Sequence, residues 1–317
     1  MILIVTNKKD YTADFVIVEL NRRGIPYIRF NTEDFPQYYS ITWTTSKAII
    51  KTQKQRSLHI NFDDVDSVWY RKPIYSVPDP NLLDDDKEFV IRESDEMLKG
   101  MWKCLEANWV NEPEKNDNAS NKLHQLVLAK KIGFSIPETI VTNNANDLID
   151  FTKTHKCTII KPIHSGLVNE DEHRVVFTNK LESIGQEKYK DIIYCPSIIQ
   201  KYIEKDIDIR VNIFGNKVFS TAIYSQRVPE AICDWRRANI LSIPHEDYKL
   251  PSKIEDLSLK MLELYGLKFG AFDLIKTKKG EYIFIELNPN GQWAWIEHLT
   301  NQPLRDALIE LLTSKGR

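Results

Sequence analysis

The strongest chemical signal in the sequence lies in the segment 286–293, ELNPNGQW. Residues two apart on a strand share a face, so a strand that ends here would point the Glu286 carboxylate and the Asn288 amide oxygen to the same side. Asp273 precedes Glu286 by thirteen residues, across a turn that contains Lys-Lys-Gly, and can lie beside it. Two carboxylates and an amide predict a site for Mg²⁺ that also binds triphosphate oxygens. The alternative is a turn after an edge strand with unrelated acidic neighbours.

Basic side chains that could contact phosphate occur earlier in the chain. Lys161 ends the apolar run 158–160, whose neighbours would bury its stem, so its ammonium group needs an anionic partner. Lys122 stands at the start of a predicted helix and could also reach phosphate. Taken singly, either lysine also fits an ordinary surface position.

The segment 198–210 combines two features. Its first half is an apolar strand whose end leaves backbone N–H and C=O groups free, as recognition of adenine requires. Its second half places Asp208 and Arg210 on one face of the next strand. A fixed guanidinium that points into a phosphate site can stabilise charge on transferring phosphoryl oxygens or on a tetrahedral intermediate. The alternative is a simple Asp-Arg ion pair at the surface.

Three further arginines are candidates for substrate binding. Arg227 and Arg236 belong to a basic cluster on the loop after the predicted strand 217–224, and they could hold an acidic substrate side chain because guanidinium pairs bidentately with carboxylate. Arg71 follows an aromatic strand and could likewise meet substrate. The alternatives are a solvated loop for the first two and a structural ion pair for Arg71.

Hydrophobic periodicity predicts the elements that must position these residues. Alternating strands and helices through residue 112 indicate a small α/β domain, and the polar stretch 111–118 indicates a linker. Further strands and helices follow the linker. We expect strands at 2–6, 25–30, 41–61 (as a hairpin), 67–70, 158–161, 174–178, 197–203, 207–214, 217–224, 268–276 and 281–287, and helices at 11–23, 87–108, 120–132, 254–265 and 303–313.

Composition and charge exclude several classes of protein. The 317 residues suggest about two domains, and 43 Lys and Arg against 45 Asp and Glu give a net charge of −2. No global field would therefore draw the chain to nucleic acid or to an anionic membrane. The four cysteines are scattered, and no apolar run approaches a membrane span or a signal peptide. We expect a soluble, cytoplasmic protein with no nucleic-acid and no membrane partner.

Common nucleotide and zinc motifs are absent from the sequence. No two glycines are separated by one residue, which excludes G-x-G-x-x-G, and no glycine precedes a lysine, which excludes the P-loop. The zinc-hydrolase motif H-E-x-x-H is also missing. If the chain binds ATP, another architecture does so.

The order of the candidate segments resembles the ATP-grasp fold. The matching segments are Lys122, IIKP around Lys161, IIQKYIEKDIDIR, FGAFDLI around Asp273, and IELNPNGQW. More narrowly, WYRKP at 69–73, the D-x-R pair and ELNPNGQWAWIE at 286–297 resemble the ATP-grasp maturases of microviridin-type peptides, the graspetide ligases. The resemblance covers essentially the whole chain.

The resemblance implies an α/β (α+β) fold in three parts: a pre-ATP-grasp α/β domain at 1–112, a central ATP-grasp subdomain at 113–203 and a C-terminal subdomain at 204–317. One departure is the loop after Lys161, which has one glycine where many ATP-grasp enzymes have several. The family's roles fall on Lys122 and Lys161 for the α and β phosphates of ATP, Gln200, Lys201, Tyr202 and Ile203 around adenine, Asp273, Glu286 and Asn288 as Mg²⁺ ligands, and Asp208 and Arg210 as the catalytic D-x-R pair.

Three functions follow as hypotheses. The first is an ATP- and Mg²⁺-dependent ligase that joins Asp or Glu side chains to Thr, Ser or Lys in a ribosomal precursor peptide. This peptide would have a leader and an acidic core. The resemblance also leads us to expect that the protein is a homodimer. The second is an ATP-grasp ligase that adds an amino acid to a small carboxylate or a protein C-terminus. The third is a nucleotide-binding module without catalysis.

Overall fold

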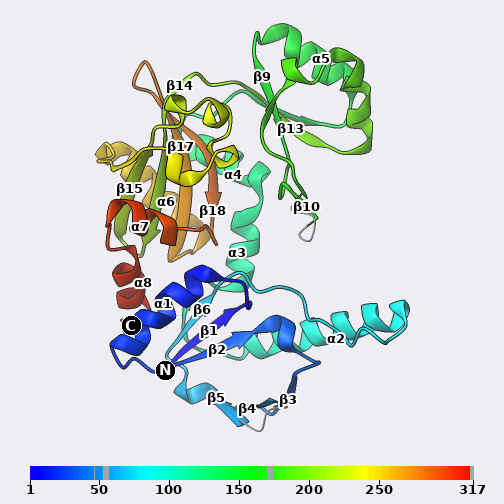
Figure 1. Cartoon of the computed structure of the whole chain (residues 1–317), viewed down its shortest axis with the longest axis vertical. Coiled ribbons are helices and arrows are strands. Elements are labelled where there is room, and N and C mark those ends of the chain that lie inside the picture. Colours follow the sequence, from blue (N-terminus) through cyan, green and yellow to red (C-terminus); the bar gives the residue numbers. More distant parts are fainter. Residues whose placement is uncertain (46, 53–56, 170–173, 315–317) are drawn as a thin grey trace. The chain divides into compact units, whose positions relative to one another are not determined.

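The computed structural model describes residues 1–45, 47–52, 57–169 and 174–314. The chain folds into two compact units (Figure 1). The first unit comprises residues 1–113, 292–294 and 303–317, and the second comprises 114–291 and 295–302. The predicted division into three parts remains a proposal, with one amendment: the last helix belongs to the first unit.

The first unit is built around a parallel sheet. Its elements are β1 (Ile2–Thr6), α1 (Tyr11–Arg22), β2 (Tyr27–Asn31), β3 (Tyr39–Trp43), β4 (Lys47–Thr52), β5 (Ser57–Asn61), β6 (Ser67–Tyr70), α2 (Asp84–Lys103), β7 (Asn108–Val110) and α8 (Leu304–Thr313). The strand order is β2-β1-β6-β7, and β3, β4 and β5 form a separate antiparallel sheet. Strand β1 is buried along its whole length, which is why its sequence is an unbroken apolar run up to Thr6.

The C-terminal helix α8 completes the first unit. The Ser67 hydroxyl of β6 donates to the carbonyl of Leu312, and the Asn108 amide of β7 donates to the carbonyl of Leu311 at 2.8 Å. Both contacts satisfy carbonyls in the last turn of α8, which has no later residues of its own to supply N–H donors. Residues more than 200 positions apart in the sequence therefore share one core.

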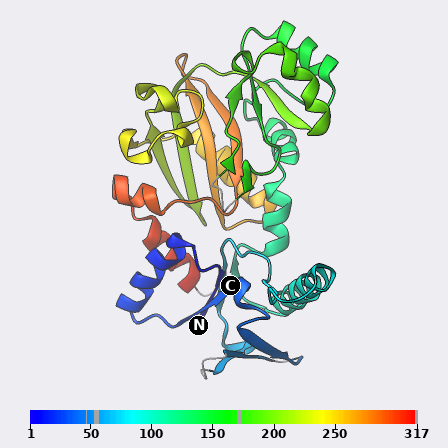
Figure 2. The ribbon, with the colours of Figure 1, turned by 45° about the vertical axis from the view of Figure 1, so that its right-hand side comes forward.

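The second unit contains a small antiparallel sheet with the order β12-β9-β13-β8. Its elements are β8 (Thr139–Thr142), α5 (Ala145–Thr154), β9 (Thr158–Lys161), β12 (Asn179–Lys180) and β13 (Ser197–Lys201). On one face Ile160 and Ile199 pack with Leu148 of α5. The green helices at the upper right of Figure 2 lie against this sheet. Ile159 and Gln200 are paired across β9 and β13 and face the opposite side.

A five-stranded antiparallel sheet, in the order β16-β15-β14-β17-β18, forms the larger part of the second unit. Val211, Phe272 and Leu287 on one face pack into a core with Leu126 of α4 and Met261 of α6. The opposite face bears polar residues. The remaining elements are α3 (Pro113–Ser120), α4 (Lys122–Ile132), β10 (Leu167–Asn169), β11 (Arg174–Val175), β14 (Lys205–Phe214), β15 (Lys217–Ile223), β16 (His245–Asp247), α6 (Ser252–Tyr265), β17 (Phe269–Thr277), β18 (Tyr282–Asn288) and α7 (Ala294–Thr300).

The structure corrects two sequence predictions. The predicted linker 111–118 is mostly helix α3, because Pro113 suits the first turn of a helix. The predicted helix 87–108 spans Asp84–Lys103, since three aspartates favour its N-terminal turn, and Asn108 belongs to β7 instead. The strands predicted around the candidate site are confirmed as β9, β13, β14, β15, β17 and β18. Of the hairpin predicted at 41–61, residues 46 and 53–56 lie outside the described residues.

Close packing of β17 on α6 makes Gly270 sensitive to substitution. A Cβ atom there would lie 2.6 Å from Leu262 Cδ1 and 2.7 Å from Leu287 Cδ1. We therefore expect Gly270→Ala to lower the free energy of unfolding by about 1–3 kcal/mol. Gly100 in α2 is the matched control, because a Cβ there meets nothing within 4 Å, and Gly100→Ala should be neutral or stabilising by up to ~1 kcal/mol. Denaturant unfolding tests both, and equal losses of stability would contradict the packing argument.

Candidate active site

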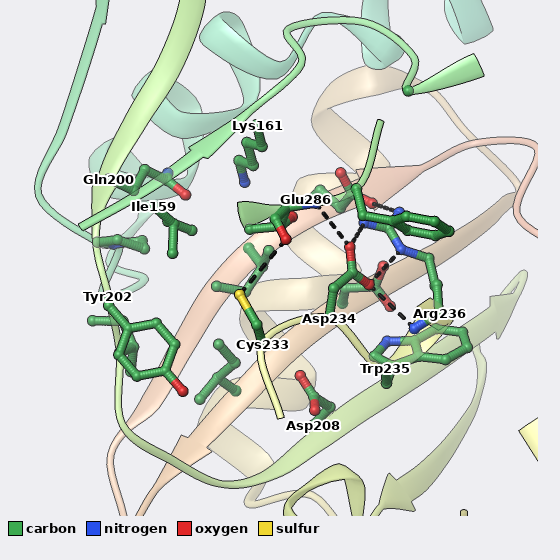
Figure 3. A pocket seen from close by; sticks show the side chains of 18 of the residues that line it. Ile159, Lys161, Gln200, Tyr202, Asp208, Cys233, Asp234, Trp235, Arg236 and Glu286 are labelled. Carbon is green, nitrogen blue, oxygen red and sulfur yellow. Dashed lines mark hydrogen bonds and ion pairs between the residues drawn. The ribbon is translucent and has the colours of Figure 1, made fainter. Parts of the chain in front are cut away.

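A pocket in the second unit is lined by both of its larger sheets and by the loops that join them (Figure 3). The small sheet contributes Ile159 and Gln200 from the face opposite its hydrophobic core. The large sheet contributes Asp273 and Glu286. The residues predicted from the sequence that line this pocket are Lys122, Lys161, Gln200, Lys201, Tyr202, Ile203, Asp208, Arg236, Asp273 and Glu286.

Three charged residues form one row across the large sheet. Arg210 of β14 is paired with Asp273 of β17, and Asp273 is paired with Glu286 of β18. Directly paired residues of antiparallel strands place their side chains side by side on the same face. Arg210 Nη1 donates to Asp273 Oδ1 at 2.9 Å. The structure thus brings together the two carboxylates and the guanidinium that the sequence singled out separately.

The Glu286 carboxylate is surrounded by cations from three other segments. Lys122 Nζ of α4 lies 3.3 Å from Glu286 Oε2, and Arg236 Nη1 lies 3.9 Å from Glu286 Oε1. Burial alone would raise the pKa of Glu286, but Lys122, Lys161 and Arg236 outweigh it and hold this pKa at about 2. Glu286 is therefore ionised at physiological pH, as a metal-ligating carboxylate must be.

The acidic pair has the donor chemistry of a magnesium site. Burial raises the pKa of Asp273, and the charge of Glu286 raises it further, against the opposing effect of Arg210. A divalent cation between the two carboxylates would relieve this repulsion. Asn288, the third predicted ligand, lies exposed at the end of β18, and its Oδ1 accepts from the Asn290 N–H at 3.0 Å. Among the described residues no group of three His, Cys, Asp or Glu could hold a metal.

Helix α4 is fixed against β18 in a way that sets the position of Lys122. The Gln125 amide donates to the Leu287 carbonyl at 2.7 Å and accepts from the Leu287 N–H at 2.9 Å. Lys122 stands one turn earlier on α4, beside Glu286, the neighbour of Leu287. Lys161 is 8% exposed, and burial, with the nearby charge of Lys122, lowers its pKa to about 8 against the effect of Glu286.

Asp208 lies in a buried network of its own. Lys205 Nζ donates to both carboxylate oxygens at 2.9 Å and to the Cys233 carbonyl at 3.4 Å. The Ser225 hydroxyl donates to Asp208 Oδ2. Burial raises the pKa of Asp208, and Lys205 and Ser225 oppose this. The network joins β14 to the loop that follows β15.

That loop holds Arg236 over the acidic row. Arg236 donates two hydrogen bonds to Asp234, each at 2.8 Å, in a bidentate pair. Trp235 packs on Trp295 of α7 with ring centroids 5.5 Å apart, which anchors the loop. The Arg236 side chain is half exposed, so it can meet a ligand in the pocket while it faces Glu286.

The hinge segment after β13 uses part of its backbone for internal hydrogen bonds. The Lys201 N–H donates to the Glu138 carbonyl at 3.0 Å, and the Tyr202 N–H donates to the Cys157 carbonyl at 2.9 Å. The expectation that these N–H groups are free for adenine is therefore wrong for Lys201 and Tyr202. The Gln200 side chain, in contrast, faces the pocket (Figure 3).

Two predicted substrate arginines do not line the pocket. Arg227 is exposed, and its guanidinium stacks on the ring of Tyr224 at 4.2 Å. Arg71 belongs to the first unit, is 1% exposed, lies 3.4 Å from Asp10 and donates to Gln292 Oε1 at 2.7 Å. The structure corresponds to the alternative stated for Arg71, a structural ion pair, because its guanidinium is buried among protein partners.

Sequence reasoning missed several residues that shape the site. Lys205 stands three residues from its partner Asp208, and Asp234 stands two residues from its partner Arg236. This short spacing of opposite charges was the available signal in the sequence. Gly291 is needed for space, since a Cβ there would lie 2.4 Å from Ala271 Cβ and 2.6 Å from Arg210 Nη2. No sequence pattern reveals that Gly291 lies so close to Arg210, because the two residues are about eighty positions apart in the chain.

The chain matches known proteins along nearly its whole length. The family model of the MvdD pre-ATP grasp domain matches residues 1–117, and that of the RimK-like ATP-grasp domain matches residues 119–312. The tetrahydromethanopterin:alpha-L-glutamate ligase of Methanocaldococcus jannaschii is 25% identical over 206 residues, which cover 63% of this chain and 68% of that protein. No helix among the described residues is long and apolar enough to span a membrane.

Two solved structures are similar over the full chain. The macrocyclase MdnC of Microcystis aeruginosa MRC, bound with precursor peptide MdnA, has a TM-score of 0.85 and 27% identity, with 98% of each chain covered. A RiPP-associated ATP-grasp ligase of Chryseobacterium gregarium, in complex with ADP and a leader and core peptide, has a TM-score of 0.88 and 29% identity, with 100% of this chain and 97% of that chain covered. These matches confirm the predicted α/β ATP-grasp fold with its N-terminal pre-ATP-grasp domain. The chain belongs to the RimK-like ATP-grasp ligases, with an MvdD pre-ATP-grasp domain over residues 1–117.

Proposed function

We propose that this ligase uses ATP and Mg²⁺ to link side chains within a ribosomal precursor peptide. An Asp or Glu carboxylate of the peptide is phosphorylated and then joined to a Thr or Ser hydroxyl or a Lys amine, which closes a macrocyclic ester or amide. The observation that supports this most is the row Arg210, Asp273 and Glu286, whose two carboxylates line one pocket together with Lys122 and Lys161. Such a set can neutralise a triphosphate and position its terminal phosphoryl group.

The chemistry needs no nucleophile from the protein. A peptide carboxylate oxygen attacks the γ-phosphorus of ATP, the bond from this phosphorus to the β–γ bridging oxygen breaks, and ADP leaves. The resulting acyl phosphate is attacked at its carbonyl carbon by a hydroxyl or an amine, and phosphate leaves while the attacking group loses its proton. Each link removes one water from the peptide overall. Catalysis then rests on position and charge stabilisation.

The lysines and acids divide the work of holding the nucleotide. Lys122 and Lys161 would contact the α and β phosphates, because both ammonium groups line the pocket near Glu286. Asp273, Glu286 and Asn288 would hold Mg²⁺ through two carboxylates and an amide. When bound, Mg²⁺ supplies Lewis-acid neutralisation of phosphoryl oxygens.

The two arginines have different surroundings and so suit different tasks. Arg210 is buried and fixed by Asp273, which suits a rigid donor to charge that develops on the transferring phosphoryl group or the tetrahedral intermediate. Arg236 is half exposed above the pocket, which suits a ligand for the incoming peptide carboxylate. Asp208 has both oxygens engaged by Lys205 and Ser225, so we now assign it a positioning role for the loop that bears Arg236.

The proposed partner is a precursor peptide with a leader and an acidic core. MdnC was solved with a precursor peptide, and the Chryseobacterium gregarium ligase with a leader and a core peptide. An acidic donor side chain also agrees with the cations that line the pocket, among them Lys122, Lys161 and Arg236. The homodimer stays a prediction.

A second candidate function is favoured by one observation. The tetrahydromethanopterin:alpha-L-glutamate ligase is 25% identical over 206 residues, and its name describes an alpha-L-glutamate ligase. This function predicts turnover with free amino acids and no leader. The third hypothesis, a module without catalysis, is set aside because the chain is an ATP-grasp ligase.

Mass spectrometry of a peptide substrate tests the proposed function. A Thr- and Glu-rich peptide with a leader, encoded beside this gene, should lose one water per link when incubated with the protein, ATP and Mg²⁺. Glu286→Gln keeps the size of the side chain but removes a metal-ligating charge, and should slow this loss about 10²-fold or more. Glu281→Gln, an exposed change on the same hairpin, is the matched control and should leave the rate unchanged. An unmodified peptide, with ADP formed only when free amino acids are added, would establish the second candidate instead.

Space at Gly291 should be needed for turnover. In Gly291→Ala the new Cβ would meet Ala271 Cβ and Arg210 Nη2, so the guanidinium or the loop must move. A displacement of about 1 Å at a catalytic group can cost 10²-fold, and we expect a loss of that order in kcat with little change in the KM for ATP. Circular dichroism and thermal unfolding would check that the variant folds. A folded variant with the parent kcat would show that Arg210 does not need this position.

The pH dependence of nucleotide affinity should report the lowered pKa of Lys161. In the free protein Lys161 loses its proton above about pH 8, and bound phosphates would raise its pKa, so binding takes up a proton above that pH. Lys161 should therefore not change the Kd for ATP, measured in EDTA, below pH 8. Above pH 8 its loss of the proton should raise this Kd by up to about tenfold per pH unit. Lys161→Arg, which stays charged, should remove this rise. Calorimetric titrations from pH 7 to about 9.5 would detect it, and identical profiles for both proteins would contradict the assignment.

A further inference from the structure

We propose that Thr139 fixes the orientation of the Gln200 side-chain amide, and that this orientation makes the pocket select a 6-amino purine over a 6-oxo purine. The inference rests on the proposed nucleotide site and specifies which base that site accepts. Thr139 is a positioning residue in this scheme, because it acts through Gln200 and does not touch the base itself.

Sheet register places the two side chains together. Thr139 of β8 is paired with Gln200 of β13, and Gln200 is paired with Ile159 of β9. The three side chains therefore share the face of the small sheet that is opposite its hydrophobic core. Gln200 is 1% exposed, and its side chain extends into the pocket beside Ile159 (Figure 3).

The direction of the hydrogen bonds fixes which end of the amide faces the pocket. The Thr139 hydroxyl has one proton, and it donates that proton to the Pro137 carbonyl at 2.8 Å. It can then only accept from Gln200, whose Nε2 lies 3.0 Å away. Nε2 is thus turned toward Thr139, and Oε1 is left as an acceptor. This oxygen is buried and has no hydrogen-bond partner among the described residues.

A buried acceptor without a partner is unfavourable until a ligand supplies a donor. The exocyclic amino group of adenine is such a donor, whereas the 6-carbonyl of guanine or hypoxanthine would place a second oxygen lone pair against Oε1. Gln200 also adjoins the hinge residues Lys201 and Tyr202, whose N–H groups are engaged by Glu138 and Cys157. The side-chain oxygen, rather than those two backbone groups, is then what distinguishes the bases.

The selectivity between ATP and ITP tests the inference, because the two nucleotides differ only at position 6 and the adjacent ring nitrogen. Calorimetric Kd values in the presence of Mg²⁺ give the ratio directly and require no peptide. The parent protein should bind ATP at least about tenfold more tightly than ITP. Thr139→Val has nearly the same shape but cannot accept from Nε2, so the amide can turn and present its donor. The preference for ATP should then fall by about tenfold, mainly through tighter binding of ITP.

Two control variants separate orientation from general damage. Thr139→Ser keeps the hydroxyl and should keep the parent ratio. Gln200→Met removes the amide at similar volume, so adding Thr139→Val to it should not change the ratio further. An unchanged ratio in Thr139→Val, or equal losses in the Val and Ser variants, would overturn the inference while nucleotide binding itself persists. Failure of the parent to bind either nucleotide would instead refute the proposed function, and the inference with it.

Discussion

The ionised carboxylate of Glu286 is the interaction on which the active site depends. A buried carboxylate is expensive unless cations and hydrogen bonds compensate it, and here the compensation comes from helix α4 through Lys122, from strand β9 through Lys161 and from the loop after β15 through Arg236. Three segments that are remote in sequence are thereby drawn to one strand. The same charge that would bind Mg²⁺ therefore also assembles the walls of the pocket, so that folding and nucleotide chemistry place the same demand on position 286.

Both of the larger sheets of the second unit are organised by the alternation of side chains between the two faces of a strand. Each sheet buries one face against helices and offers the other to the pocket, which is why Ile160 and Ile199 enter a core while Ile159 and Gln200 do not. In the large sheet the same alternation separates Phe272 from Asp273. One strand therefore supplies apolar side chains to the core and polar side chains to the pocket, even though the register of β17 and β18 shifts between Asp273 and Leu274.

Local patterns predicted much of this site, and contacts across the fold supplied the rest. The spacing of Asp273 and Glu286 along a hairpin was sufficient to predict neighbouring carboxylates, because register within a hairpin depends on nearby residues. The contact of Asp208 with Ser225 was not predictable, since it forms only when the loop after β15 meets β14, whereas Lys205 stands three residues from Asp208 on the same strand. For Arg71 the sequence left substrate binding and a structural ion pair open, because its partner Gln292 lies 221 residues further along the chain. The helix α3 was missed because a polar composition resembles a linker, although Pro113 marks a helix start.

The position of helix α8 has a consequence for how the protein is made. The ribosome synthesises strands β6 and β7 long before helix α8. The carbonyls of α8 accept hydrogen bonds from the side chains of these two strands. Until α8 has been synthesised, the sheet of the first unit lacks one of its covering layers and exposes apolar surface that α8 later buries through Leu308 and Leu312. The order of synthesis and the order of assembly are therefore opposed: the part that emerges first is completed last. A nascent chain that has all of its catalytic residues is still one helix short of a finished first unit.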